Sequence, residues 1–234
     1  MTTSELSPAP QAPRRRPHRV RRALSTVLIV AGLLLLADAA ATLLWQEPVS
    51  AVYANLQQGR LGDQLAELEA APLEPVERRA LERLEDPARR LAFRARALER
   101  RLEGGDAMGR IAIPAAGVDE VVVHGTGTSD LRKGPGHYPE TPLPGERGTV
   151  AVAGHRTTYG APFRRLDDVE RGDRVSLSMP YGRFTYRVER VRIVPPTATW
   201  VTDRVAYDRL VLTACHPLYS AAQRIIVFAR LERF

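Results

Sequence analysis

The residue with the clearest chemical potential is Cys215, the only cysteine in 234 residues, which ends the β-branched run "RLVLTAC". In an oxidising compartment structural cysteines come in pairs, so a single thiol is either buried and inert or present for its chemistry. A thiolate is an effective nucleophile for acyl transfer. The lone cysteine therefore indicates nucleophilic catalysis, with an inert buried thiol as the alternative.

A catalytic thiol needs an acid/base partner, and the best-placed histidine is His155. It ends the run "GTVAVAGH" just as Cys215 ends its own run, so two strand ends could present an imidazole and a thiolate to one groove. An uninvolved loop histidine is the alternative. The remaining histidines are less suitable by position: His18, His124, His137 and His216.

Arg224 begins the run "RIIVFARL", nine positions after Cys215. If the two runs pair antiparallel, the end of the first and the start of the second meet, which puts Arg224 beside Cys215. A guanidinium there could donate forked, charge-assisted hydrogen bonds to a substrate carbonyl or oxyanion without titrating. The alternative is a solvated turn arginine. Alternation places Thr213 on the Cys215 face and Ala214 on the opposite face.

The elements that must position these residues are short β-branched runs bounded by Gly, Pro and Asp. They are "GRIAIP", "VDEVVV", "GTVAVAG", "DRVSLS", "RFTYRVERVRIV", "RLVLTAC" and "RIIVFARL". Seven or eight such strands predict an all-β domain over residues 105–234, as a closed or sandwiched antiparallel sheet. Residues 134–148 are rich in Pro and Gly and predict an ordered loop, and residues 161–173 predict one helical turn.

The N-terminal part predicts export. Residues 1–22 form a basic tail, and residues 23–45 form an apolar run that spans about 33 Å as a helix, enough for a hydrocarbon core of about 30 Å. The positive-inside rule then places the N-terminus in the cytoplasm and residues 46–234 outside. A cleaved signal peptide is the alternative, because "LLLLADAAAT" offers small residues in an A-x-A arrangement.

Residues 46–104 predict a helical juxtamembrane stalk. Leu61, Leu65 and Leu68 share one helical face, and prolines divide the segment into pieces. A solvated stalk is the main expectation. Self-association through the leucines, and binding of the arginines to anionic headgroups or wall polymers, are alternatives.

Charge and composition exclude other classes. The 34 basic residues exceed the 27 acidic ones and give a net charge of +7. No basic face interleaved with aromatic residues accompanies this charge, so we expect no nucleic-acid partner. We also expect no metal and no cofactor.

The stretches "AVAGHRTTYGAPFRRLD" and "LVLTACHPLYSAAQRIIVFARL", together with "GRIAIPAAGVD" and "KGPGHYPETPLPGERGTVAVAGHRTTYG", resemble the sortases. These are membrane-anchored cysteine transpeptidases of Gram-positive bacteria, and the resemblance is strongest to class E sortases of high-GC actinobacteria. It covers about Gly109 to Leu231 and implies a sortase-like closed β-barrel. It further implies His155 as general acid/base, Cys215 as the nucleophile and Arg224 as the group that positions the sorting-signal carbonyl.

By the same resemblance the substrates are surface proteins with a C-terminal LAxTG- or LPxTG-like signal, cut between Thr and Gly. A peptidoglycan-precursor amine then resolves the thioester. Tyr138 and Thr213 are candidate substrate-binding residues. Two alternatives from other classes stay open: an L,D-transpeptidase-like wall enzyme, whose usual Ser-His-Gly-Cys motif is missing here, and a non-catalytic membrane-tethered adhesion or scaffold module.

Overall fold

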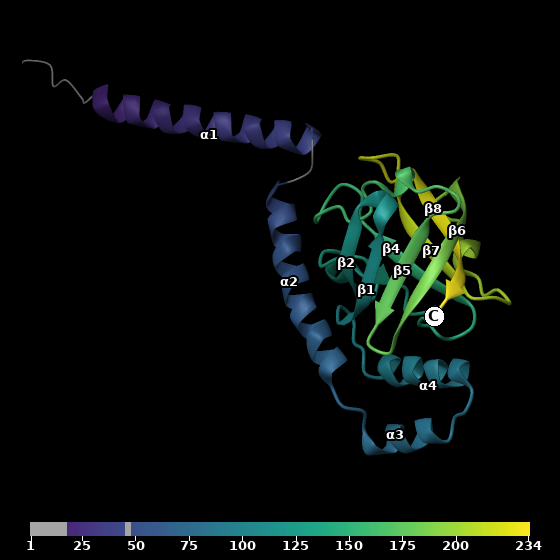
Figure 1. The fold of residues 1–234 in the computed structure, drawn as a ribbon. Helices are drawn as coiled ribbons and strands as arrows, with labels where there is room; N and C mark the ends of the chain where they lie inside the picture. The colour runs from purple at the N-terminus through teal and green to yellow at the C-terminus, as the bar shows by residue number, and fades with distance from the viewer. Residues whose placement is uncertain (1–17, 45–47) are drawn as a thin grey trace, which may run out of the picture. The chain divides into compact units, whose positions relative to one another are not determined.

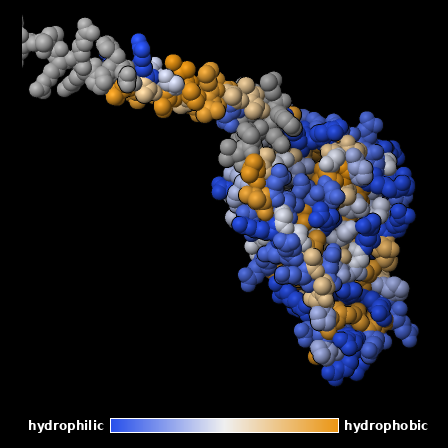
Figure 2. Space-filling model, turned by 60° about the vertical axis from the view of Figure 1, so that its left-hand side comes forward, coloured by the Kyte–Doolittle hydropathy of each residue, from blue (hydrophilic) through white to orange (hydrophobic). Residues whose placement is uncertain are grey.

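The computed structural model describes residues 18–44 and 48–234, and the chain divides into two units, Met1–Leu44 and Trp45–Phe234 (Figure 1). The described residues of the first unit form the helix α1 (His18–Leu44). Its segment Val20–Ala41 has a mean hydropathy of 2.2 and is long and apolar enough to cross a membrane. Figure 2 shows the corresponding surface as largely hydrophobic.

The second unit is built on a closed barrel of eight strands, in the order β1-β2-β3-β4-β7-β8-β6-β5. The expected closed all-β barrel is therefore confirmed. The strands are β1 (Ala107–Ile113), β2 (Val118–His124), β3 (Gly136–His137), β4 (Thr149–Gly154), β5 (Arg174–Met179), β6 (Gly182–Val194), β7 (Arg209–His216) and β8 (Gln223–Arg233).

The expectation of a purely antiparallel sheet was wrong, because β2–β3 and β4–β7 pair in parallel. A parallel pair needs a long crossover, and the chain between β4 and β7 supplies one that carries the whole β5–β6 hairpin. Strand β3 was also missed. It is only two residues long and lies in the Pro- and Gly-rich stretch that we expected to be a loop.

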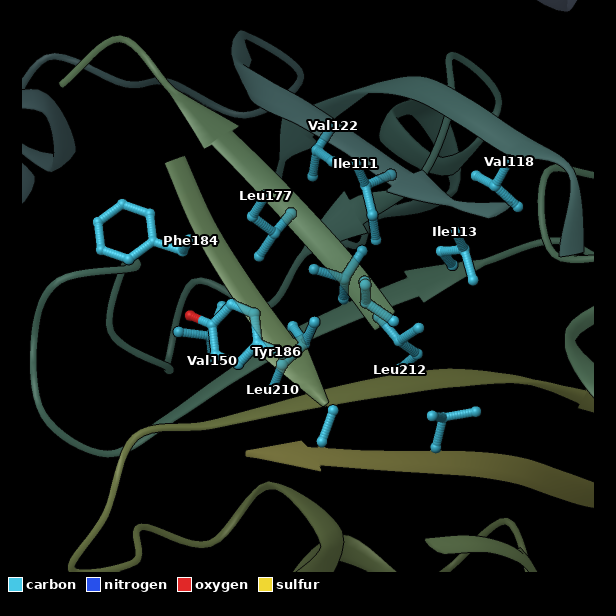
Figure 3. Close-up of a cluster of buried hydrophobic side chains, with 14 of the residues drawn as sticks. Ile111, Ile113, Val118, Val122, Val150, Leu177, Phe184, Tyr186, Leu210 and Leu212 are labelled. Carbon is cyan, nitrogen blue, oxygen red and sulfur yellow. The ribbon is translucent and has the colours of Figure 1, made fainter. Parts of the chain in front are cut away.

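Alternation of side chains explains the two faces of the barrel wall. Val150 of β4, and Leu210 and Leu212 of β7, point into the main core (Figure 3). Val152 of β4 belongs to the same core cluster. The residues between them, such as Val211, face outward into a second cluster. Its buried members are Ala151, Val194, Val201, Val211, Ile226 and Phe228.

Three further helices precede the barrel: α2 (Pro48–Ala70), α3 (Pro75–Glu82) and α4 (Pro87–Glu99). All three begin at a proline, where a missing N–H costs no helical hydrogen bond. Short helical turns connect the strands elsewhere: η1 (Pro114–Ala116), α5 (Thr128–Leu131), η2 (Leu166–Asp168) and η3 (Thr199–Thr202). The turn expected within residues 161–173 is η2.

The helix α2 is not a solvated stalk, because it packs on the outside of β1 and β2. Leu61 and Leu65 are 3% and 4% exposed and form a cluster with Ala107, Val121 and Val123. The Gln58 amide also pairs with β2: it accepts from the Val121 N–H at 2.7 Å and donates to the Val121 carbonyl at 3.0 Å. The strand β2 is apolar on both faces and needs this cover.

Candidate active site

The parallel pair β4–β7 brings two of the expected site residues to one end of the barrel. Its last registered pair is Gly154 with Ala214, and the next residues in sequence are His155 after β4 and Cys215 in β7. Parallel strands run in the same direction, so both residues follow at the same edge of the sheet. In an antiparallel pair, the two strand ends would lie at opposite edges.

Cys215 belongs to the outer face of the barrel. Its neighbour Ala214 is 4% exposed and contributes to the interior core, as expected from its position in the motif. Successive strand side chains point to opposite faces, so the half-buried, free thiol of Cys215 faces outward. The thiol is therefore accessible from the side of the barrel rather than from its interior.

Arg224 lies directly across from Cys215 on the antiparallel neighbour β8. Cross-strand partners have Cβ atoms about 4.5–5.5 Å apart and share a face, so the adjacency expected from the nine-residue spacing is confirmed. The Arg224 Nη1 donates to the carbonyls of Ala221 and Gln223, both at 2.9 Å. A guanidinium has five N–H donors, so these bonds leave donors for a substrate carbonyl.

Tyr138 and Thr213 lie together on the same outer face. The Tyr138 hydroxyl is 3.0 Å from the Thr213 Oγ1. Thr213 is 5% exposed and precedes Cys215 by two residues, so it shares the Cys215 face. The Tyr138 ring packs against the outer cluster that includes Val211. The two residues thus form one hydrogen-bonded unit beside the thiol.

The surroundings of His155 favour its neutral form. Burial lowers the pKa of the imidazole, and the positive charge of Arg132 lowers it further. The ring of Tyr159 lies 5.5 Å from the imidazole, centroid to centroid. The Arg132 guanidinium in turn lies 5.4 Å from the Tyr159 ring centroid.

The N-terminal end of α2 contacts the loop that follows His155. The Tyr159 N–H donates to the Ser50 Oγ at 3.1 Å, and the Tyr53 and Tyr159 rings meet edge to face at 6.4 Å. Sequence reasoning missed this contact, and it missed Arg132 and Tyr159 as neighbours of His155. Only Tyr159 carried a signal, because it follows the histidine by four residues.

Two other histidines form a separate stacked pair, in which His137 is buried and His124 is half-buried. His124 on β2 and His137 on β3 are register partners, and their rings stack at 5.6 Å. Burial lowers the pKa of His137 to about 4, and its Nε2 contacts Thr141 Oγ1 and the Pro142 carbonyl. This pair is separate from the group formed by His155, Cys215 and Arg224. The side chain of His18 lies outside the described residues.

Within the part of the chain that the structure describes, no group of three or more His, Cys, Asp or Glu side chains could hold a metal ion.

Comparison with known proteins identifies the barrel. A family model described as a sortase domain matches residues 111–232. Sortase D of Bacillus subtilis is 36% identical over 132 residues, which cover 55% of this chain and 65% of that protein. Sortase SrtE2 of Streptomyces coelicolor is 26% identical over 144 residues, covering 54% and 56%. The chain thus spans less than two thirds of these curated relatives.

Solved structures agree on the fold. Sortase E from Streptomyces avermitilis is 35% identical, with a TM-score of 0.51 over 56% of this chain and 91% of that one. A Clostridium perfringens sortase D5 transpeptidase gives a TM-score of 0.60 over 76% of this chain and 99% of that one, at 22% identity. The second likeness supports the fold alone.

Proposed function

Since the chain belongs to the sortase family of cysteine transpeptidases, we propose that it joins surface proteins to a cell-wall amine through a thioester on Cys215. The substrate is a C-terminal LAxTG- or LPxTG-like sorting signal, cleaved between Thr and Gly. The acceptor is the amine of a peptidoglycan precursor.

The proposed reaction needs one nucleophile and one acid/base group. The neutral His155 imidazole first takes the proton of the Cys215 thiol, and the thiolate attacks the Thr carbonyl carbon. The Thr–Gly bond then breaks as His155 gives that proton to the departing Gly nitrogen. The acceptor amine then attacks the thioester and loses its proton to His155. The thiolate leaves, and a new amide bond has formed.

The observation that carries this proposal is the row across β4, β7 and β8. His155 and Cys215 follow the last registered pair of a parallel ladder, and Arg224 is the cross-strand partner of Cys215. In this position the Arg224 guanidinium stabilises negative charge on the Thr carbonyl oxygen during attack.

Signal selection is assigned to the outer face beside Cys215. The hydrogen bond between Tyr138 and Thr213 fixes a phenol next to the path of an extended peptide. We assign the chain to class E with preference for LAxTG, on the motif resemblance and the similarity to a class E structure. A class D relative is also similar, so the two signals must be compared directly.

The membrane arrangement is part of the same proposal. The apolar segment Val20–Ala41 anchors the protein, with the N-terminus in the cytoplasm and the barrel outside. Protease added to intact protoplasts should remove the barrel and leave a membrane-bound stub. A soluble, secreted protein that starts near residue 40 would instead support a cleaved signal.

The test uses the full chain in detergent micelles, with LAxTG and LPxTG peptides and an amine acceptor, read by mass spectrometry. We expect a cleaved peptide joined to the acceptor, with a higher kcat/KM for LAxTG. Tyr138→Phe should reduce this preference and leave cleavage intact. An enzyme that cleaves neither peptide, although its thiol reacts with an alkylator, would contradict the proposed substrate class.

A further inference from the structure

The largest fully buried side chain among the described residues belongs to Arg156, which directly follows His155. The residue is 2% exposed. Burying a guanidinium is costly unless its charge and its N–H groups are matched, so its partners indicate what it holds in place.

The partners of Arg156 come from two other segments. On one side, Nη2 forms an ion pair with Asp167 Oδ1 at 2.6 Å, and Nη2 and Nε donate to the Arg164 carbonyl at 2.9 and 3.2 Å. On the other side, Nη1 lies 3.4 Å from the Cys215 carbonyl oxygen and 3.2 Å from His216 Nδ1. One planar group thus connects the η2 region to the end of β7.

These contacts lie where the β4–β7 ladder stops. The last registered pair is Gly154 with Ala214. Beyond it the His155 carbonyl accepts a hydrogen bond from the Phe163 N–H at 2.9 Å. Arg156 is attached to His155 by one peptide bond. The Arg156 side chain therefore adds a link beyond the end of the ladder and ties the backbone next to His155 to the Cys215 carbonyl.

We infer that Arg156, held by Asp167, is a positioning residue that sets the distance between the His155 imidazole and the Cys215 thiol. This inference rests on the proposed transpeptidase function. It assigns Arg156 no contact with the substrate, because its guanidinium lies with His216 on the opposite face of the strand from the thiol. Its effect is on the rate of proton transfer and attack, which depends on sub-ångström geometry.

Lysine cannot fill this position. An ammonium is a point donor on a flexible stem, whereas the guanidinium donates in one plane toward Asp167, the Arg164 carbonyl and the Cys215 carbonyl together. Asp167 provides the counter-charge. Burial opposes its ionisation, but hydrogen bonds from Arg156 and from the backbone hold the pKa of this carboxyl below its usual range.

The experiment measures kcat and KM of the full chain in detergent, with each rate divided by the amount of thiol that a cysteine alkylator titrates. Arg156→Lys should lower kcat about 10- to 100-fold and leave KM within about twofold. Asp167→Asn should lower kcat less, and Arg156→Lys combined with Asp167→Asn should match Arg156→Lys alone, because the two residues act as one unit.

The matched control is Arg165→Gln, which breaks the exposed ion pair of Arg165 with Asp168 in the same loop (2.7 Å) and should leave kcat unchanged. Wild-type kcat in a folded Arg156→Lys variant would overturn the inference. Additive losses in the double variant, or a change in KM alone, would overturn it as well. If Arg156→Lys fails to fold, Asp167→Asn decides by the same criteria. No turnover by the wild type would instead reject the proposed function.

Discussion

Substitution of Arg224 tests whether a guanidinium opposite Cys215 contributes to the reaction. Loss of one oxyanion donor costs about 10²–10³ in turnover, or roughly 2.7–4 kcal/mol, so we expect a loss of that order for Arg224→Ala and partial recovery for Arg224→Lys. The control is Arg230→Ala on the same strand, because Arg230 pairs with Arg209 at the other end of the β7–β8 ladder. Its side chain forms an exposed ion pair with Glu189 and lies over the Tyr207 ring. Equal kcat/KM for wild type and folded Arg224→Ala would mean that another group stabilises the negative charge on the carbonyl oxygen.

Substitution of Arg132 should change the pKa of His155 while the histidine itself is kept. Burial is the first cause of the lowered pKa of His155, and the Arg132 charge is the second. Arg132→Gln should therefore raise the His155 pKa and move the protonated, proton-donating form to higher pH. The shift can be followed by NMR titration of the imidazole.

The control for this titration is Lys133→Gln. Lys133 is the neighbouring cation, but its ammonium donates to the Gly105 carbonyl and its charge has no part in the His155 shift. A His155 pKa that stays the same in Arg132→Gln, or falls, would contradict the electrostatic account of this site.

At the scale of elements, the contact between α2 and the barrel should carry stability. Leu61→Ala removes a side chain buried against Val121 and Val123 and should cost about 2–5 kcal/mol in free energy of unfolding. The matched control is Leu56→Ala on the same helix, because Leu56 is 63% exposed and should change stability by less than about 0.5 kcal/mol. Thermal melts of the two variants give the comparison, and equal losses would mean that α2 does not dock.

The site could be predicted further than the topology. Cys215, His155 and Arg224 each stand at an end of a β-branched run, so strand periodicity alone placed them at sheet edges, and the nine-residue spacing gave the β7–β8 hairpin. The parallel β4–β7 pair was not predictable in this way, because pairing across a long crossover depends on the fold as a whole. The docking of α2 was missed because a leucine stripe does not specify what covers it.

At the scale of the whole molecule, His137 should make the barrel sensitive to acid. Its folded-state pKa of about 4 lies below the ordinary value of about 6.5, so the unfolded chain binds more protons between these pH values. Stability is therefore lost as the pH falls through this window, by about 3 kcal/mol in total. Melting temperatures across this range should fall more steeply for the wild type than for His137→Gln.

His18→Gln is the control for this measurement, because His18 lies in the other unit and should leave the slope unchanged. Equal pH slopes for the wild type and His137→Gln would show that the acid sensitivity has another origin.

The central claim, a thioester on Cys215, is tested most directly by the intact mass of the full-length protein after incubation with an LAxTG peptide and no acceptor amine. The account predicts a mass increase that corresponds to the acyl fragment ending at Thr, with the adduct located on Cys215. The adduct should be released when an amine is added, and it should be absent in Cys215→Ala. Ordinary peptide cleavage by Cys215→Ala, or an adduct on any other residue, would contradict it.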